Sequence, residues 1–369
     1  MSNLVLYRKY RPKNFSDLVG QEHIVKTLTN AIKTDKVAHA YLFTGQRGTG
    51  KTTVARLLAK AVNCVSKDKN QSYEPCNKCS ACKEINEAKS LDLIEIDAAS
   101  NRGIDEIREL RDGIKFSPTN LKTKVFIIDE VHQLTKEAFN ALLKTLEEPP
   151  THAIFILATT ESHKMPQTII SRCQKFDFHR IPLERLIKRL SWIAKQENIK
   201  IEKPALELIA LNAEGSVRDA ESLLGQIISV NDKEISLKDI EGVLGLSSFK
   251  AIQELSEYLF DKKPAKAVSQ VNQIMNQGYD LIQFSKSLVD YLRKMMLLKV
   301  DNQLADLVIN ELTSEQKESL VNQKEKISQE DLLRLIHLFI KAGNDAKYAD
   351  FPQLPIELAI VEFCESKQI

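Results

Sequence analysis

This sequence of 369 residues has little cysteine, tryptophan, glycine and proline, and almost no net charge. Its six cysteines are too few for a small disulfide-stapled protein, and its 12 glycines and 11 prolines exclude collagen-like and low-complexity chains. A formal charge of +2 excludes the bulk basicity of a dedicated nucleic-acid binder. Any contact with nucleic acid must therefore come from local clusters.

Long apolar stretches are also missing. No run reaches the roughly 18 apolar residues that a transmembrane helix requires. The N-terminal segment MSNLVLYRKYRP has no apolar core of the kind that signal peptides carry. We therefore predict a cytoplasmic protein with no membrane partner.

The composition that remains is that of a globular protein, with 43% hydrophobic and 28% charged residues and enough length for two or three domains. Five short runs rich in β-branched and aromatic residues alternate with stretches of helical spacing, which predicts an α/β fold with a parallel, helix-covered sheet. After about residue 180 apolar residues recur at intervals of three and four, so we expect only helices there. The predicted strands are residues 41–44, 93–97, 125–129, 153–159 and 175–178.

A phosphate-binding loop is predicted between the first strand and the next helix. Residues 45–52 read GQRGTGKT, a pattern in which glycines let backbone N–H groups surround phosphates at a helix N-terminus. Lys51 would neutralise the β- and γ-phosphates, and Thr52 would offer an oxygen to Mg²⁺. A glycine-rich turn that matches by chance is the alternative, disfavoured by the flanking strand and helix. The residues expected to bind the nucleotide are Gly45, Gln46, Arg47, Gly48, Thr49, Gly50, Lys51, Thr52 and Thr53.

Two acidic residues follow the apolar run that begins at residue 125. Asp129 can hold Mg²⁺ through water, and Glu130 can polarise the water molecule that attacks the γ-phosphate. Taken alone, such a pair could simply cap the next helix. Together with the phosphate-binding loop, it predicts nucleotide hydrolysis. The strand at 93–97, between the two motifs in sequence, resembles the additional-strand class of P-loop ATPases.

Four of the six cysteines lie close together in the sequence, which in a reducing compartment indicates a metal site rather than disulfides. Four thiolates complete a tetrahedral Zn²⁺ site with no open position, so we expect a structural role in ordering residues 63–83. Free thiols and a redox or iron–sulfur centre are the alternatives, but nothing nearby indicates an electron-transfer partner. The predicted zinc ligands are Cys64, Cys76, Cys79 and Cys82.

Further motifs accompany these three. They are YRKYRP at 7–12, DLVGQE at 17–22, DEVH at 129–132, LLKTLEEPP at 142–150 and SRC at 171–173. In this combination the chain resembles the gamma/tau subunits of the bacterial DNA polymerase III clamp loader, a family of AAA+ ATPases. The resemblance is strongest over residues 1–230 and reduces to a helical pattern after 244.

The resemblance implies a three-part organisation. It places an AAA+ ATP-binding domain with a zinc-binding insertion at 63–83 in residues 1–179, and a small helical lid in residues 180–243. A helical collar at 244–369 would join five subunits into a ring.

The resemblance also assigns roles to three polar residues. Arg172 would be an arginine finger in the ATP site of a neighbouring subunit, where it stabilises charge on the transferring phosphate. Arg218, in GSVRDA at 215–220, would sense the γ-phosphate. Thr160 would be the first sensor, although the adjacent Thr159 leaves the register open. Without the resemblance, these are a surface arginine, a salt-bridge former and a strand residue.

The adenine base is placed by the resemblance between the N-terminal segment and the lid. The residues brought in are Tyr7, Arg11 and Val19. The neighbouring Arg8 and Lys9 fit a solvated basic patch equally well.

The implied function is that of an ATP-hydrolysing motor subunit that works with other subunits in a five-membered ring. It would open a sliding clamp and load it onto primer-template DNA, using ATP, Mg²⁺ and structural Zn²⁺. Arg102 is the candidate DNA contact, because it opens a helix in the corresponding place. We expect the protein in the bacterial cytoplasm, associated with the nucleoid through the replisome.

Two alternatives stay open. A non-hydrolysing scaffold subunit of the same ring is disfavoured by the intact Lys51, Thr52, Asp129 and Glu130. Another AAA+ DNA-remodelling ATPase, such as a branch-migration helicase, is disfavoured by the four cysteines and the SRC motif. Contacts with polymerase and helicase are expected only through a C-terminal tail of a longer product.

Overall fold

The computed structural model describes residues 5–65, 73–100, 113–114, 116–230, 234–244, 249–300 and 314–365. The chain divides into two compact units, residues 1–235 and residues 236–369. The boundary that we predict at 243/244 remains a prediction.

The first unit is built on a parallel sheet of five strands in the order β2-β3-β4-β1-β5. All five predicted strands are confirmed. Their bounds are β1 Ala40–Gly45, β2 Leu93–Asp97, β3 Lys124–Asp129, β4 Ala153–Thr159 and β5 Gln174–Phe178. Strand β4, which separates β1 from β3, is buried along its whole length because helices cover both faces of the sheet.

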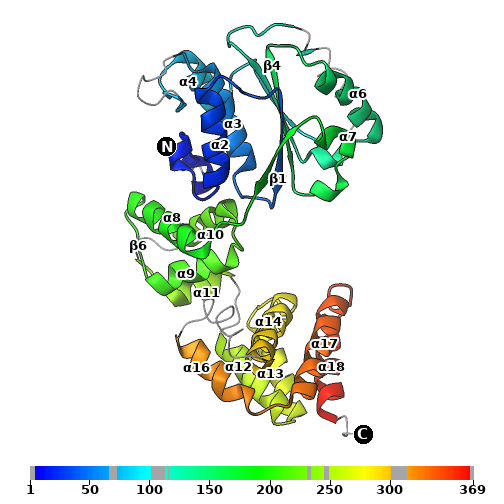
Figure 1. The fold of residues 1–369 in the computed structure, drawn as a ribbon. Coiled ribbons are helices and arrows are strands. Elements are labelled where there is room, and N and C mark those ends of the chain that lie inside the picture. The colour runs from blue at the N-terminus through cyan, green and yellow to red at the C-terminus, as the bar shows by residue number, and fades with distance from the viewer. Residues whose placement is uncertain are drawn as a thin grey trace. The chain divides into compact units, whose positions relative to one another are not determined.

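Helices cover the sheet on both sides (Figure 1). Alternate strand residues divide between two apolar cores, so that Tyr41 and Phe43 of β1 pack on one face and Leu42 on the other. The first face carries α2 (Glu22–Lys33) and α3 (Lys51–Asn63), and the second carries α6 (Lys136–Glu147) and α7 (Gln167–Ile170). Short elements complete this part: α1 Leu6–Lys9, η1 Phe15–Asp17, α4 Ser80–Asn86, η2 Val131–Gln133 and η3 Ser162–Lys164.

Three longer helices follow β5 in the first unit: α8 (Leu183–Gln196), α9 (Lys203–Asn212) and α10 (Val217–Val230). The expectation of helices alone after residue 180 is wrong in one detail. Strands β6 (Lys200–Ile201) and β7 (Glu234–Ile235) form a parallel pair. Two residues are too few to give an alternating pattern, so the sequence carries no signal for them.

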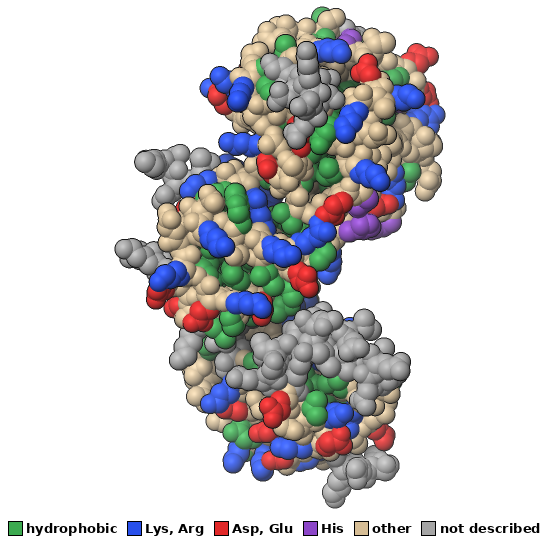
Figure 2. All heavy atoms as spheres, turned by 60° about the vertical axis from the view of Figure 1, so that its left-hand side comes forward, with side chains coloured by type: hydrophobic (Ala, Val, Ile, Leu, Met, Phe, Trp, Pro, Cys, Tyr) green, Lys and Arg blue, Asp and Glu red, His purple; other side chains and the backbone are tan. Residues whose placement is uncertain are grey.

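The second unit is helical throughout its described residues. Its core joins residues from α12, α13, α14, α17 and α18, including Leu255, Leu288, Leu335 and Phe363. The helices are α11 Leu237–Leu244, α12 Phe249–Phe260, α13 Pro264–Asn276, α14 Leu281–Val300, α16 Ser314–Lys324, α17 Gln329–Asp345 and α18 Gln353–Glu365. None of the described helices is long and apolar enough to cross a membrane. Figure 2 shows basic and acidic side chains interspersed on the visible face, as the small net charge leads one to expect.

Candidate functional site

The loop between β1 and α3 has backbone geometry that requires glycine. Gly48 has a φ of 77°, and a Cβ atom there would lie 1.9 Å from Ser216 Oγ at the start of the lid helix α10. The Gly48 carbonyl accepts a hydrogen bond of 3.1 Å from the Val217 N–H. The glycine therefore lets the loop approach the lid directly.

Lys51 is folded back against this loop. Its side chain is 5% exposed, and Nζ donates to the carbonyl oxygens of Gly45 at 2.7 Å and Gln46 at 3.0 Å. Burial lowers the pKa of Lys51, while Glu130 and Asp129 act to raise it. Gln46 Oε1 is buried and has no hydrogen-bond partner in the described part of the chain. A buried cation that contacts only neutral carbonyls fits a site that takes an anionic group.

The start of α3 meets the end of β3. Thr52 Oγ1 donates to Asp129 Oδ2 at 2.8 Å, so one hydroxyl and one carboxylate oxygen lie side by side. Hard oxygen ligands of this kind suit Mg²⁺, which keeps several waters and takes few protein ligands. The donor set therefore fits the predicted magnesium ion.

Glu130 lies beside Asp129 with a left-handed φ of 48°. Its Oε2 accepts hydrogen bonds from Thr160 Oγ1 at 2.9 Å and from the Thr160 N–H at 3.4 Å. The Thr159 hydroxyl has a different partner, because its Oγ1 lies 2.9 Å from His132 Nδ1. Of the two threonines, Thr160 is the one that contacts Glu130.

A cavity of about 560 Å³ runs from the loop to the N-terminal segment. It is lined by most of the predicted nucleotide-binding residues and by several others: Tyr7, Arg11, Pro12, Leu18, Val19, Arg47, Gly48, Thr49, Gly50, Lys51, Thr52, Thr53, Asp97, Ala99, Asp129, Glu130, Arg189, Val217, Arg218 and Glu221. Gly45, Gln46 and Thr160 line a second cavity of about 610 Å³, to which Arg47 and Glu130 also contribute.

Arg11, predicted beside the base, and Arg218, predicted to sense the γ-phosphate, have contrasting surroundings. The Arg218 guanidinium lies 4.9 Å from the centre of the Tyr7 ring, a cation–π contact that links the lid to the N-terminal segment. Its hydrogen bond lowers the pKa of Tyr7. Arg11 is half-buried, and this burial lowers its pKa, as does the nearby cation Arg56.

Sequence reasoning missed a buried ion pair in the wall of the cavity. Arg189 Nε donates to Glu221 Oε1 at 2.9 Å, with the two side chains 10% and 4% exposed. Burial raises the pKa of Glu221, against the effect of Arg189. The pair joins α8 to α10, and no local pattern could have identified it because the partners are distant in sequence. Asp97 also lines the cavity, and its place at the end of a parallel strand was the signal available for it.

Arg172 lies away from both cavities. Its Nη2 contacts Glu147 Oε1 at 2.6 Å, and its Nη1 donates to the Thr168 carbonyl at 2.8 Å. Its side chain is about one-third exposed. Arg172 therefore lies outside the two cavities around the phosphate-binding loop of its own chain. Arg102 lies outside the described residues.

The four clustered cysteines come together as predicted. The sulfur atoms of Cys64, Cys76, Cys79 and Cys82 all lie within 4.8 Å of one another. Backbone N–H groups of Lys78 and Cys79 each lie 3.4 Å from Cys76 Sγ. Burial acts to raise the pKa of Cys79, but N–H donors and neighbouring thiols outweigh it and lower the pKa to about 6. Four thiol groups that converge with donors around them fit a tetrahedral zinc ion.

The chain is similar to known families and proteins over nearly its whole length. Residues 20–182 match the family described as DNA polymerase III, delta subunit. Residues 185–233 match the ATPase lid domain of DNA polymerase III clamp loader subunits, and residues 235–369 match domain III of the gamma and tau subunits.

Individual relatives agree with these families. The chain is 45% identical to the DNA polymerase III subunit tau of Bacillus subtilis, over 99% of this chain and 64% of that protein. It is 37% identical to the subunit gamma of Buchnera aphidicola from Acyrthosiphon pisum, over 98% of both chains. Identity to the Escherichia coli subunit tau is 42%, over 76% of this chain and 43% of that protein. The chain therefore belongs to the family of DNA polymerase III gamma and tau subunits.

Proposed function

We propose that this chain is the ATP-hydrolysing motor subunit of a DNA polymerase III clamp loader, which opens a sliding clamp and loads it onto primed DNA. The observation that carries the proposal is the convergence of Lys51, Thr52, Asp129 and Glu130 at one end of the sheet. Membership of the gamma and tau family supports the assignment to clamp loading.

Each of these residues has a task in ATP hydrolysis. Lys51 leaves the carbonyls of Gly45 and Gln46 for the β- and γ-phosphates, which then satisfy its buried charge. Thr52 and Asp129 hold Mg²⁺, which when bound neutralises charge on the phosphates. Glu130 orients and polarises the attacking water, and the Thr160 hydroxyl holds the Glu130 carboxylate in place.

Two arginines act on the γ-phosphate from different chains. Arg218 reaches it from the lid of the same chain, since it already lines the cavity beside Gly48. Arg172 acts in trans on the site of the next subunit, which is supported by its position away from both cavities of its own chain. Supplying this charge from a neighbour couples hydrolysis to assembly of the ring.

The remaining parts of the proposal concern partners and location. The partners are the other subunits of a five-membered ring, a sliding clamp and primer-template DNA, with Arg102 as a DNA contact. Polymerase and helicase are partners only if the full-length product carries a C-terminal tail. The cysteine cluster holds a structural Zn²⁺. The protein works at the replisome in the bacterial cytoplasm.

Substitution Glu130→Gln tests the proposal against the scaffold alternative. We expect ATP binding, measured by isothermal titration, to stay within a factor of about three, while ATP turnover in the assembled ring falls by about a hundredfold. Glu137→Gln, at an exposed position in the first turn of α6, is the matched control. Equal turnover by Glu130→Gln and the parent chain would contradict the proposed role.

A further inference from the structure

The segment that leads to the base side of the cavity is held by two carboxylates. Asp17 Oδ2 accepts from the N–H groups of Lys13 at 3.2 Å and Asn14 at 3.0 Å. The next two N–H groups, of Phe15 and Ser16, donate to the two oxygens of Glu74 at 2.8 and 2.9 Å. Four consecutive N–H groups are thereby bound, the last two by a residue of the cysteine-containing insertion.

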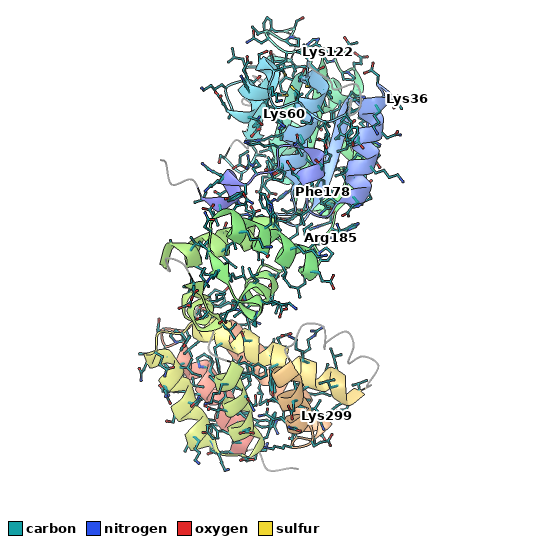
Figure 3. All side chains as sticks on the ribbon, turned by 90° about the vertical axis from the view of Figure 1, so that its left-hand side faces the viewer. Lys36, Lys60, Lys122, Phe178, Arg185 and Lys299 are labelled. Atoms are coloured by element: carbon teal, nitrogen blue, oxygen red, sulfur yellow. The ribbon has the colours of Figure 1, made fainter. Side chains whose placement is uncertain are left out.

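A buried lysine reinforces the same junction. Lys60, on α3, is 2% exposed, and its Nζ donates to the Lys13 carbonyl at 2.7 Å. The same Nζ donates to the side-chain oxygens of Asn77 at 2.8 Å and Asn86 at 3.0 Å. Figure 3 labels Lys60, which belongs to α3 in the first unit. One cation therefore ties the phosphate-loop helix, the N-terminal segment and the insertion together.

The cysteine cluster fixes the insertion's half of these contacts. Asn77 follows Cys76 directly and has a left-handed φ of 55°, in the turn that places Cys76 and Cys79 together. Its Nδ2 also donates to the Lys13 carbonyl at 3.2 Å. Glu74 precedes Cys76 by two positions, so the two anchoring residues Glu74 and Asn77 lie on either side of this cysteine in the chain.

The other end of the anchored segment forms the wall of the cavity. Leu18 and Val19, directly after Asp17, both line it. Beyond them, the Gln21 side chain donates to the His179 carbonyl at 2.7 Å and accepts from the His179 N–H at 3.2 Å. Leu18 and Val19 thus lie between one anchor at His179, just after β5, and another at the insertion that carries the cysteine cluster.

We propose that the cysteine cluster with its metal is a positioning device for the base side of the nucleotide site, acting through Glu74 and Lys60 on Leu18 and Val19. The inference rests on the proposed nucleotide site and adds a coupling to it. When the metal is lost, the wall that contacts the base loosens while the phosphate-binding loop stays formed. Metal removal should therefore weaken binding of ATP and leave binding of a phosphate chain without a base unchanged.

The test uses the full chain loaded with zinc and two probes, ATP and inorganic tripolyphosphate, each titrated calorimetrically before and after chelation. We expect the Kd for ATP to rise by about tenfold on chelation and the Kd for tripolyphosphate to change by less than about twofold. Unchanged ATP affinity would overturn the inference. An equal loss for both probes would also overturn it, because the cluster would then support the whole site.

Variant Glu74→Gln separates the contact from the metal. We expect it to retain one zinc per chain by metal analysis, to lose ATP affinity as chelation does, and to show little further loss when chelated. Glu87→Gln, exposed at the C-terminal end of α4 just after the insertion and paired with Lys89, is the control that should behave like the parent chain. Full additivity of Glu74→Gln and chelation would contradict the coupling. If neither probe binds the zinc-loaded parent chain, the proposed nucleotide site fails and the inference with it.

Discussion

At the scale of single residues, the two consecutive threonines at the C-terminal end of β4 have different partners. Thr159 is fully buried and contacts His132, whereas Thr160 donates to the Glu130 carboxylate. The Nε2 atom of His132 in turn lies 3.2 Å from Glu161 Oε1. The sequence does not show which of the two threonines contacts Glu130, because this depends on which hydroxyl the end of the strand turns toward the Glu130 carboxylate.

Substitution Thr160→Val removes the hydroxyl that holds Glu130 and preserves the shape of the side chain. We expect kcat for ATP hydrolysis to fall by about tenfold with KM nearly unchanged, because the carboxylate loses its orientation and not its charge. Steady-state kinetics of the assembled ring would measure both constants. A rise in KM with kcat unchanged would show instead that Thr160 serves nucleotide binding.

Lys51 and Arg172 make a contrasting pair of tests. Lys51→Ala should abolish ATP binding or turnover in the chain that carries it, since its Nζ lies within the loop. Arg172→Ala should leave ATP binding intact and suppress hydrolysis only in the assembled ring. Equal loss of ATP affinity in both variants, measured by titration, would refute the assignment of Arg172 to a neighbouring site.

At the scale of elements, one buried carboxylate organises the turn that leads into β3. Asp92 is 1% exposed and accepts hydrogen bonds from the N–H groups of Thr119, Asn120 and Leu121, at distances from 2.7 to 3.0 Å. Burial acts to raise the pKa of Asp92, but the N–H donors outweigh it and lower the pKa.

Substitution Asp92→Ala should therefore lower the free energy of unfolding by about 3 kcal/mol, since buried N–H groups are left without partners. The folded pKa lies below the unfolded value of about 3.9, so this contribution is present above about pH 4 and is lost as pH falls through the folded pKa. The free energies of unfolding of the parent chain and the variant, measured with denaturant, should approach each other as pH falls from about 4 through the folded pKa. A difference that stays constant down to pH 2 would contradict the account.

The contrast between predicted and unpredicted elements has a physical basis. The inner strands β1, β3 and β4 were predictable because each is a run of largely apolar residues that a parallel sheet buries on both faces. The edge strands β2 and β5 are short and carry polar and charged residues among their apolar ones, so their signal was weaker. The phosphate-binding loop and the cysteine cluster were predictable because the residues that form each of them lie close together in the sequence. The Arg189–Glu221 pair and the Glu74 anchor join residues distant in sequence, and no periodicity reports such contacts.

At the scale of the whole molecule, the chain combines the proposed nucleotide site in its first unit with a helical second unit that matches domain III of gamma and tau subunits. The chain spans 64% of the Bacillus subtilis relative and 43% of the Escherichia coli relative. In the proposed ring, ATP binding orders the subunits, and DNA completes the trans sites and triggers hydrolysis, which shifts the population among assembly states.

We propose that this chain is a DNA-triggered ATPase motor. The most direct test is steady-state ATP hydrolysis with the partner subunits and the clamp present, compared without DNA and with primer-template DNA. We predict strong stimulation by the primed junction, absent when the chain carries Glu130→Gln. Negligible turnover that DNA leaves unchanged, despite measurable ATP binding, would contradict the motor assignment and favour a scaffold subunit.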